Sequence, residues 1–284
     1  MTTATPSPHA LPEIRLSRGF RPSAWLTLFW VSFQQLARGR RLLSLAALFA
    51  LPALLAWVIR TNVPRDEIHN PGNIEKVLVF YMIPQALVPL TALILATGMV
   101  RDEVEGQTIT YLLIRPLPRW SIYAAKLLAA WCVGASLAAV FDTATLAATH
   151  WGEPDLWGPV LPTRAAQVAG LSALSMFVYV ALFGAVGLVV RWVLPLGVAY
   201  IVLIEGAFAN IDFALRRVTV LWYVRVLAER WLGLHVDSWS IKLDESPSGP
   251  EALLTLLAAA LVLSVGAAWL FGRREIRVKT PEGA

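Results

Sequence analysis

Two acidic residues, Glu205 and Asp142, lie inside long apolar stretches of the sequence. An ionisable side chain at membrane depth is costly, and it often marks a transport path or a proton relay. Glu205 lies about twelve residues, roughly 18 Å of helix, into its apolar stretch, which predicts either a pathway residue or a hydrogen-bonded structural carboxyl group. Asp142 lies near the end of its stretch, which favours a water-wetted carboxylate at the membrane interface over a pathway residue.

The residues needed for several other chemistries do not occur in the required patterns. Hydrolysis of ATP needs a phosphate-binding loop of the form G-x-x-x-x-G-K-[ST], and no lysine of this chain follows a glycine. Neither HExxH nor GxSxG occurs, so we predict no catalytic residues. The chain has one cysteine, Cys132, and its histidines are scattered, so we predict solvated histidines and no metal site. The histidines are His9, His69, His150 and His235.

A third group of residues forms the segment Arg101–Arg119, with the sequence RDEVEGQTITYLLIRPLPR. Its acidic residues Glu103 and Glu105 come early, where they would suit the positive end of a helix dipole. Pro116 and Pro118 would then end that helix. The leucines and isoleucines between them need cover from the membrane interface or from a partner protein. The segment therefore predicts a short helix that packs against the membrane interface or a partner.

The elements that position these residues follow from composition. The chain is 57% hydrophobic and only 15% charged, against about 25% charged in ordinary soluble domains, which predicts an integral membrane protein. The net charge of +5 comes from basic residues beside apolar blocks. This position favours a role in membrane topology over nucleic-acid binding, so lipid and not nucleic acid is the expected partner.

Six stretches approach the roughly 20 apolar residues that cross a bilayer as a helix. They predict an all-α membrane protein with spans over about 42–59, 77–100, 122–148, 166–190, 193–210 and 252–271. We expect one transmembrane domain over 24–271, between a disordered cytoplasmic tail, 1–23, and a basic cytoplasmic tail, 272–284. Most of the 24 lysines and arginines then fall on the side of the N-terminus, which predicts that both termini are cytoplasmic.

Two further segments combine apolar and basic residues without the features of a simple span. Residues 24–37 have apolar residues at helical spacing and precede an arginine cluster, which predicts an N-terminal interfacial amphipathic helix. The alternative is that they begin the first span. Residues 213–232 mix apolar residues with four arginines and predict an outer re-entrant or interfacial helical segment, with Trp222, Tyr223 and Trp231 at headgroup depth. A seventh, marginal span is the alternative.

The segment after the second span resembles the inner loop of type-2 ATP-binding-cassette (ABC) exporter permeases. The matching features are an acidic pair, a threonine, a leucine pair, a proline and two basic residues. They fall on Glu103, Glu105, Thr108, Leu112, Leu113, Pro116, Arg119 and Lys126. The family usually places glycine directly before the threonine, whereas Gln107 separates Gly106 from Thr108 here. This departure affects the expected turn geometry.

The resemblance implies a permease subunit of an ATP-driven exporter in the plasma membrane. It implies a dimer of identical or homologous permeases that form the substrate pathway, and a separate ATPase subunit that carries ATP and magnesium, so this chain itself binds no cofactor. Coupling to that subunit would fall on Glu103, Glu105, Gly106, Thr108, Leu112, Leu113, Pro116 and Arg119. A secondary transporter or channel without an ATPase partner, and a membrane-embedded enzyme, remain alternatives.

Overall fold

The computed structural model describes residues 22–63, 74–105, 117–152, 160–208, 214–234, 236, 239, 241 and 243–273, with the backbone alone for 100–105. Every regular element in these ranges is helical, which confirms the predicted all-α class. The elements are α1 (Pro22–Ala37), α2 (Arg40–Asn62), η1 (Lys76–Leu87), α4 (Val88–Glu105), α6 (Arg119–Thr149), α8 (Val160–Val189), α9 (Val193–Ala199), η2 (Tyr200–Ala207), η4 (Ala214–Val218), α10 (Val220–Leu232), η6 (Leu243–Glu245) and α11 (Gly249–Arg273).

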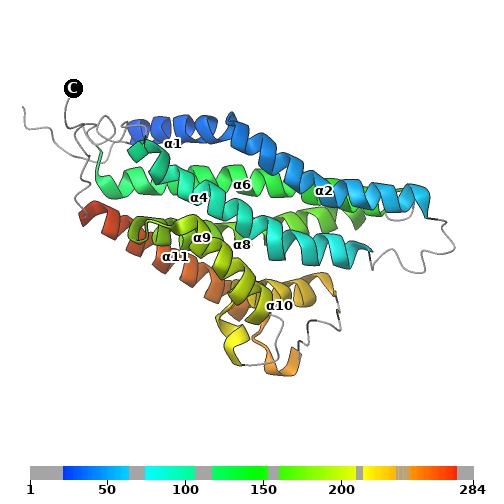
Figure 1. Cartoon of the computed structure of the whole chain (residues 1–284). Coiled ribbons are helices and arrows are strands. Elements are labelled where there is room, and N and C mark those ends of the chain that lie inside the picture. The colour runs from blue at the N-terminus through cyan, green and yellow to red at the C-terminus, as the bar shows by residue number, and fades with distance from the viewer. Residues whose placement is uncertain are drawn as a thin grey trace, which may run out of the picture.

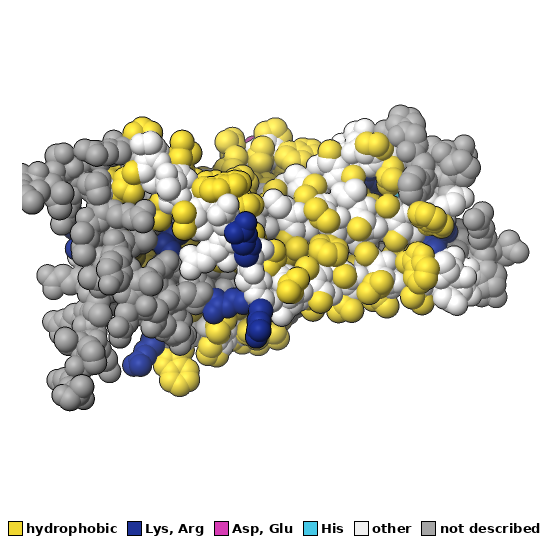
Figure 2. All heavy atoms as spheres, turned by 90° about the horizontal axis from the view of Figure 1, so that it is seen from above, with side chains coloured by type: hydrophobic (Ala, Val, Ile, Leu, Met, Phe, Trp, Pro, Cys, Tyr) yellow, Lys and Arg dark blue, Asp and Glu magenta, His cyan; other side chains and the backbone are white. Residues whose placement is uncertain are grey.

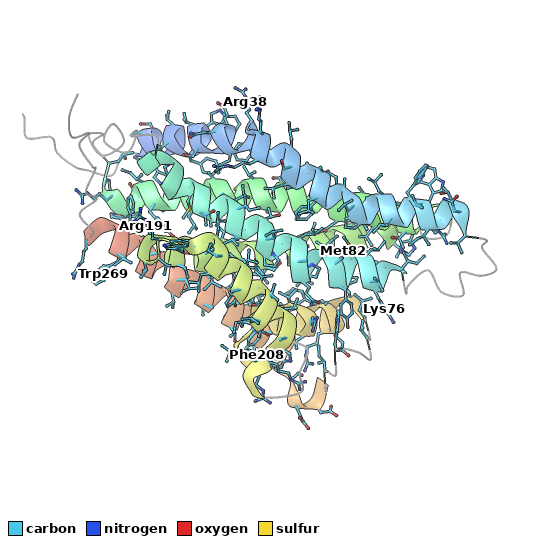
Figure 3. The ribbon with its side chains drawn as sticks, in the orientation of Figure 1. Arg38, Lys76, Met82, Arg191, Phe208 and Trp269 are labelled. Carbon is cyan, nitrogen blue, oxygen red and sulfur yellow. The ribbon has the colours of Figure 1, made fainter. Side chains whose placement is uncertain are left out.

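The helices form one elongated bundle with α6 and α8 at its centre (Figure 1). Helices α1, α2 and α4 cover one side of this pair, and α9, α10 and α11 cover the other. We call the two ends of the bundle the Arg119 end and the Asn62 end. Arg191 and Trp269 lie at the Arg119 end and Lys76 lies toward the Asn62 end (Figure 3). The segment between α4 and α6 therefore leaves and re-enters the bundle at the Arg119 end.

Five helices are long and apolar enough to cross a membrane. They are Arg40–Asn62, Lys76–Met99, Arg119–Thr149, Val160–Val189 and Gly249–Arg273. The predicted span 193–210 is instead the shorter apolar helix Val193–Ala207, which rises only about 22 Å at 1.5 Å per residue. Five of the six predicted spans therefore correspond to helices of spanning length, and the predicted span 193–210 is not confirmed.

The outermost helices expose their apolar side chains. In the most apolar part of α11 only 17% of the residues are buried, and in α2 only 22%, against 56% in the central helix α8. The surface of the α1 and α2 side is mostly apolar toward the Asn62 end, and lysines and arginines gather nearer its middle (Figure 2). Helices that are apolar all round need a non-aqueous solvent, so this surface fits lipid.

The two additional segments are both helical and both pack along the bundle. Helix α1 runs beside the first part of α6 rather than across the end of the bundle (Figure 1), and the Trp25 indole N–H donates to the Ser121 carbonyl at 2.9 Å. Helix α10 has 13 residues, too few for a seventh span, and packs on α8 and α11. The Trp222 ring is only 2% exposed and packs in the protein core, so it does not face lipid, and its depth in the membrane stays a prediction.

Two helices contain a π-helical segment, one before α8 in the chain and one after it. The π-helical η1 contains Pro84 and leads into α4, and the π-helical η2 contains Glu205 and follows α9. These two segments contact each other. Wide turns of this kind are rare and often occur at functional sites, so this contact draws attention to Glu205 and its neighbours.

Candidate functional site

The predicted docking segment begins differently from the sequence expectation. Helix α4 continues without a break to Glu105, the last residue described before Leu117, so the backbone of Glu103 and Glu105 belongs to the helix of the second predicted span. The expected placement of these two residues in the first turn of a separate helix is therefore wrong. Gly106, Thr108, Leu112, Leu113 and Pro116 lie outside the described residues.

The segment re-enters the bundle through a short anchored turn. Leu117 is only 3% exposed and packs with Leu28 of α1 and with Ile122 of α6. Pro118 has extended backbone and precedes Arg119, the first residue of α6. The Ser121 hydroxyl donates to the Pro118 carbonyl at 2.8 Å. A force applied to the segment would therefore reach both α6 and α1 directly.

Glu205 lies in η2 and is fully buried. Its Oε1 accepts hydrogen bonds from the Tyr200 hydroxyl at 2.8 Å and from the Val220 backbone N–H at 3.1 Å. Its Oε2 accepts from the Leu221 backbone N–H at 3.0 Å. The carboxyl group thus satisfies backbone donors in the first turn of α10, next to the Thr219 side chain, which accepts from the Trp222 N–H. This arrangement is the hydrogen-bonded alternative that the sequence left open.

Asp142 lies in α6 and is 0% exposed. The prediction of a water-wetted interfacial carboxylate is therefore wrong. The neighbouring helix α8 places Ser172 beside its carboxyl group. Asp142 is buried because α8 packs along α6 and begins at Val160, six residues before the predicted span 166–190. A pathway role for Asp142 stays a prediction.

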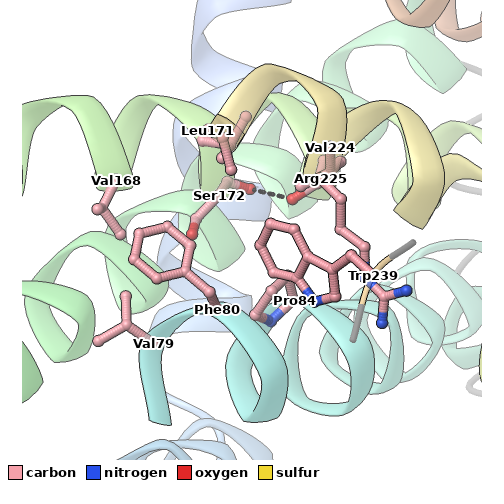
Figure 4. Close-up of a pocket in the computed structure, with 11 residues that line it drawn as sticks. Val79, Phe80, Pro84, Val168, Leu171, Ser172, Val224, Arg225 and Trp239 are labelled. Atoms are coloured by element: carbon pink, nitrogen blue, oxygen red, sulfur yellow. Dashed lines mark hydrogen bonds between the residues drawn. The ribbon is translucent and has the colours of Figure 1, made fainter. Parts of the chain in front are cut away.

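Arg225 of α10 is a buried cation. It is only 2% exposed, and its guanidinium lies 5.3 Å from the ring centre of Tyr81 and 5.5 Å from that of Trp239. It also donates to Gln85 Oε1 at 3.2 Å. Figure 4 shows Arg225 beside a small cavity between η1, α8 and α10 that Ser172 also lines. Stacking on aromatic faces lets a guanidinium stay buried in such a site.

The small cavity of about 10 Å³ has room for about one water molecule. It is lined mainly by apolar side chains such as Val79, Phe80 and Leu171. It is too small for a transported molecule in this conformation. The polar groups of α6, α8, η1, η2 and α10 therefore form a closed buried cluster rather than an open path.

A second buried polar cluster joins three helix ends at the Asn62 end. Glu75 Oε1 accepts from the Arg164 Nε at 2.6 Å, and Glu75 Oε2 lies 3.1 Å from the His150 Nε2. Burial by itself would raise the pKa of Glu75, but the hydrogen bond with His150 and the charge of Arg164 outweigh it and hold the pKa below its ordinary value. His150 is only 7% exposed, so the prediction of a solvated histidine is wrong for this residue.

Comparison with known protein families finds one matching model, described as ABC-2 family transporter protein, over residues 28–206. The match covers more than half of the chain, including the 101–119 segment, Asp142 and Glu205. The chain belongs to the ABC-2 transporter family. Among the curated proteins compared with it, none matches.

Membership of the ABC-2 family makes the chain a multi-pass membrane protein and a transmembrane component of an ABC transporter, not its ATPase. The family implies association with an ABC ATPase and with the membrane. It does not favour a secondary transporter or channel without an ATPase. The matched region ends at residue 206, so α10 and α11 of this ABC-2 protein lie beyond it.

Proposed function

We propose that this chain is the permease subunit of an ATP-driven exporter in the plasma membrane. Two permease subunits would form the substrate pathway, and a separate ATPase subunit would dock on residues 101–119 at the Arg119 end. Both termini would lie on the same cytoplasmic side. The observation that supports this proposal most strongly is that α4 carries Glu103 and Glu105 at the Arg119 end of the bundle, within a chain of the ABC-2 family.

Electrostatics gives the reason why a partner is expected at this position. Asp102, Glu103 and Glu105 place three carboxylates within about one turn of the α4 backbone. Like charges this close together on a helix repel one another, and a basic surface on an ATPase would replace this repulsion by attraction. The leucine pair Leu112 and Leu113 would supply an apolar contact beside this acidic turn.

The geometry also offers a route for mechanical coupling. Helix α6 has 31 residues and α4 has 18, so both carry a displacement of the docking segment deep into the bundle. Helix α1 would stabilise the start of α6, because Trp25 is hydrogen-bonded to the Ser121 carbonyl and Leu28 packs with Leu117. ATP-driven movement of the partner would then tilt α4 and α6 together.

The test combines partner identification with charge reversal. The tagged permease is purified in mild detergent, and the co-purifying subunits are identified and counted. The double variant Glu103→Lys with Glu105→Lys should lose the ATPase subunit and its permease-stimulated ATP hydrolysis. The matched control is Asp244→Lys with Glu245→Lys, which makes the same charge change on exposed residues of η6, away from the Arg119 end.

The control double variant should bind the ATPase and stimulate it as the unmodified permease does. An acidic-to-basic change at 103 and 105 that leaves both subunit recovery and ATPase stimulation unchanged would contradict the proposed docking site. Absence of any co-purifying ATPase from the unmodified permease would contradict the proposed function itself.

A further inference from the structure

A cavity of about 280 Å³ lies where α1 meets α2, between this junction and helices α4 and α6. Three cationic side chains line it: Arg40 and Arg41 from the start of α2, and Lys126 from α6. Lys126 is only 7% exposed, whereas Arg40 and Arg41 are exposed. The cavity therefore has a buried cation in its wall and two long, exposed cationic side chains beside it.

The other lining groups are suited to an anion. Ser32 and Gln35 of α1 contribute polar side chains, and none of the described residues that line the cavity is acidic. The cavity lies at the N-terminus of α2, whose N-cap Gly39 provides no side-chain acceptor. The backbone N–H groups of a first helical turn and the positive end of the dipole favour an anion such as phosphate.

The opposite wall of the cavity is apolar. Leu36, Ile94, Leu95 and Met99 line it. The neighbouring surface of α2 also carries exposed apolar side chains, including Leu43 at 72% exposure. Figure 2 shows lysine and arginine atoms gathered at the middle of this face, with a mostly apolar surface continuing toward the Asn62 end. A phosphate attached to an acyl chain matches this succession of charged and apolar surfaces.

We propose that this cavity binds a phosphate group, presented by an anionic phospholipid of the membrane leaflet at the Arg119 end. The headgroup phosphate would lie among Arg40, Arg41 and Lys126, and an acyl chain would lie along α2. Basic pockets between transmembrane helices are a recognised setting for anionic lipid headgroups. The proposal uses the cavity and its cations and does not depend on the docking of an ATPase.

The experiment uses the full chain in nanodiscs of phosphatidylcholine with or without phosphatidylglycerol. Native mass spectrometry counts the phosphatidylglycerol molecules that stay bound after mild delipidation. The test variant is Arg40→Gln with Arg41→Gln, and the matched control is Arg38→Gln, which removes a charge from the same junction but does not line the cavity. Figure 3 shows Arg38 extending away from the bundle. Inorganic phosphate, added as a competitor, distinguishes a soluble phosphate from a lipid headgroup.

The unmodified chain and Arg38→Gln should retain phosphatidylglycerol, and the double variant should bind it about 30-fold more weakly at low ionic strength, from the usual contribution of two basic residues near an anionic surface. Arg40→Lys with Arg41→Lys should restore binding. Displacement of the lipid by millimolar inorganic phosphate would overturn the lipid assignment and give the site a soluble ligand. Equal losses in Arg38→Gln and in the double variant, or no loss in either, would overturn the proposal as a whole.

Discussion

The Oε2 atom of Glu205 in η2 accepts a hydrogen bond from the Leu221 backbone N–H in α10 at 3.0 Å. A carboxyl group from one helix thus caps the first turn of another within the buried part of the bundle. Backbone donors at a helix start need such partners, and in an apolar setting their loss is costly. The contact fixes where α10 begins relative to the shorter apolar helix before it.

Replacement of Glu205 separates its structural role from a role in transport. Glu205→Leu removes the acceptors of three donors and should destabilise the protein by about 2–5 kcal/mol, because each unsatisfied buried donor costs about 1–3 kcal/mol and the effects overlap. Glu205→Gln keeps one acceptor oxygen and should cost less. Thermal unfolding in detergent and transport assays on both variants measure these effects.

The two roles give different results in these assays. A structural cap predicts that transport falls in parallel with folded protein in both variants. A pathway role predicts that Glu205→Gln folds normally and yet transports poorly. Full transport with normal expression in both variants would remove Glu205 from the pathway and also contradict its importance as a cap.

Much of the bundle could be predicted from the sequence because lipid exposure is a local property. Apolar stretches such as those leading to α2, α6 and α11 need no knowledge of their neighbours to be recognised as spans. The capping role of Glu205 could not be predicted, because its partner Leu221 lies 16 residues away and the chain must turn back before they meet. Its depth in an apolar stretch marks Glu205 as unusual, but does not indicate what it contacts.

The cluster of Glu75, His150 and Arg164 predicts a dependence of stability on pH. The pKa of Glu75 is lower in the folded protein than its ordinary value near 4.5, so its stabilising effect is complete above that value and declines as pH falls through the lowered folded pKa. Glu75→Gln should destabilise the protein by about 1–3 kcal/mol at neutral pH. The difference from the unmodified protein should shrink only in acid.

Unfolding in chemical denaturant from neutral pH down to about pH 3, below the ordinary pKa values of carboxylates, measures this difference. Lys76→Gln is the control, because it changes the charge of the adjacent residue without touching the Glu75 carboxylate. A stability difference between Glu75→Gln and the unmodified protein that stays constant down to the lowest pH would contradict the proposed charge pairing.

Trp25 and Trp30 allow a test of the support that α1 gives to α6. Trp25→Phe removes the hydrogen bond to the Ser121 carbonyl but keeps most of the ring, so stability should fall by only about 0.5–1.5 kcal/mol. If α1 helps to carry force from the docking segment, ATPase stimulation by the permease should fall more than stability does. Trp30→Phe, on the exposed face of the same helix at 56% exposure, should change neither. Equal effects of the two changes would remove the specific role of Trp25.

Gly197 of α9 lies against Leu93 of α4, and an added Cβ there would overlap the Leu93 side chain. Gly197→Ala should therefore push the two helices apart and destabilise the protein by about 1–3 kcal/mol, as overpacking does in protein cores. Leu93→Ala made in the same chain should recover part of this loss. Gly170→Ala is the control, since no heavy atom lies within 4 Å of the position that its Cβ would take. Thermal unfolding in detergent is measured for the unmodified protein, Gly197→Ala, Gly197→Ala with Leu93→Ala, and Gly170→Ala. Equal stability of Gly197→Ala and Gly170→Ala would contradict the predicted overlap.

The buried polar clusters show where the sequence was least informative. Glu75, His150 and Arg164 each lie beside the end of a long helix, and the predicted topology brings those three ends to the same side. Their position on the same side is the one feature of the sequence that could have indicated a contact among them. A charged residue near a helix end is, however, ordinarily a solvated one. Arg225 is another buried charge, and its guanidinium lies over the rings of Tyr81 and Trp239. Burial of a charge depends on long-range packing that no local pattern contains.

The most direct test of the central claim is the side of the membrane on which residues 101–119 lie. The chain has one cysteine, so Cys132→Ser gives a background free of cysteine, into which Gln107→Cys or Asp244→Cys is introduced. A membrane-impermeant maleimide is applied to intact cells and to inverted vesicles. The account predicts labelling of residue 107 only in inverted vesicles and of residue 244 only in intact cells. Labelling of residue 107 from outside intact cells would contradict docking of an ATPase at this segment.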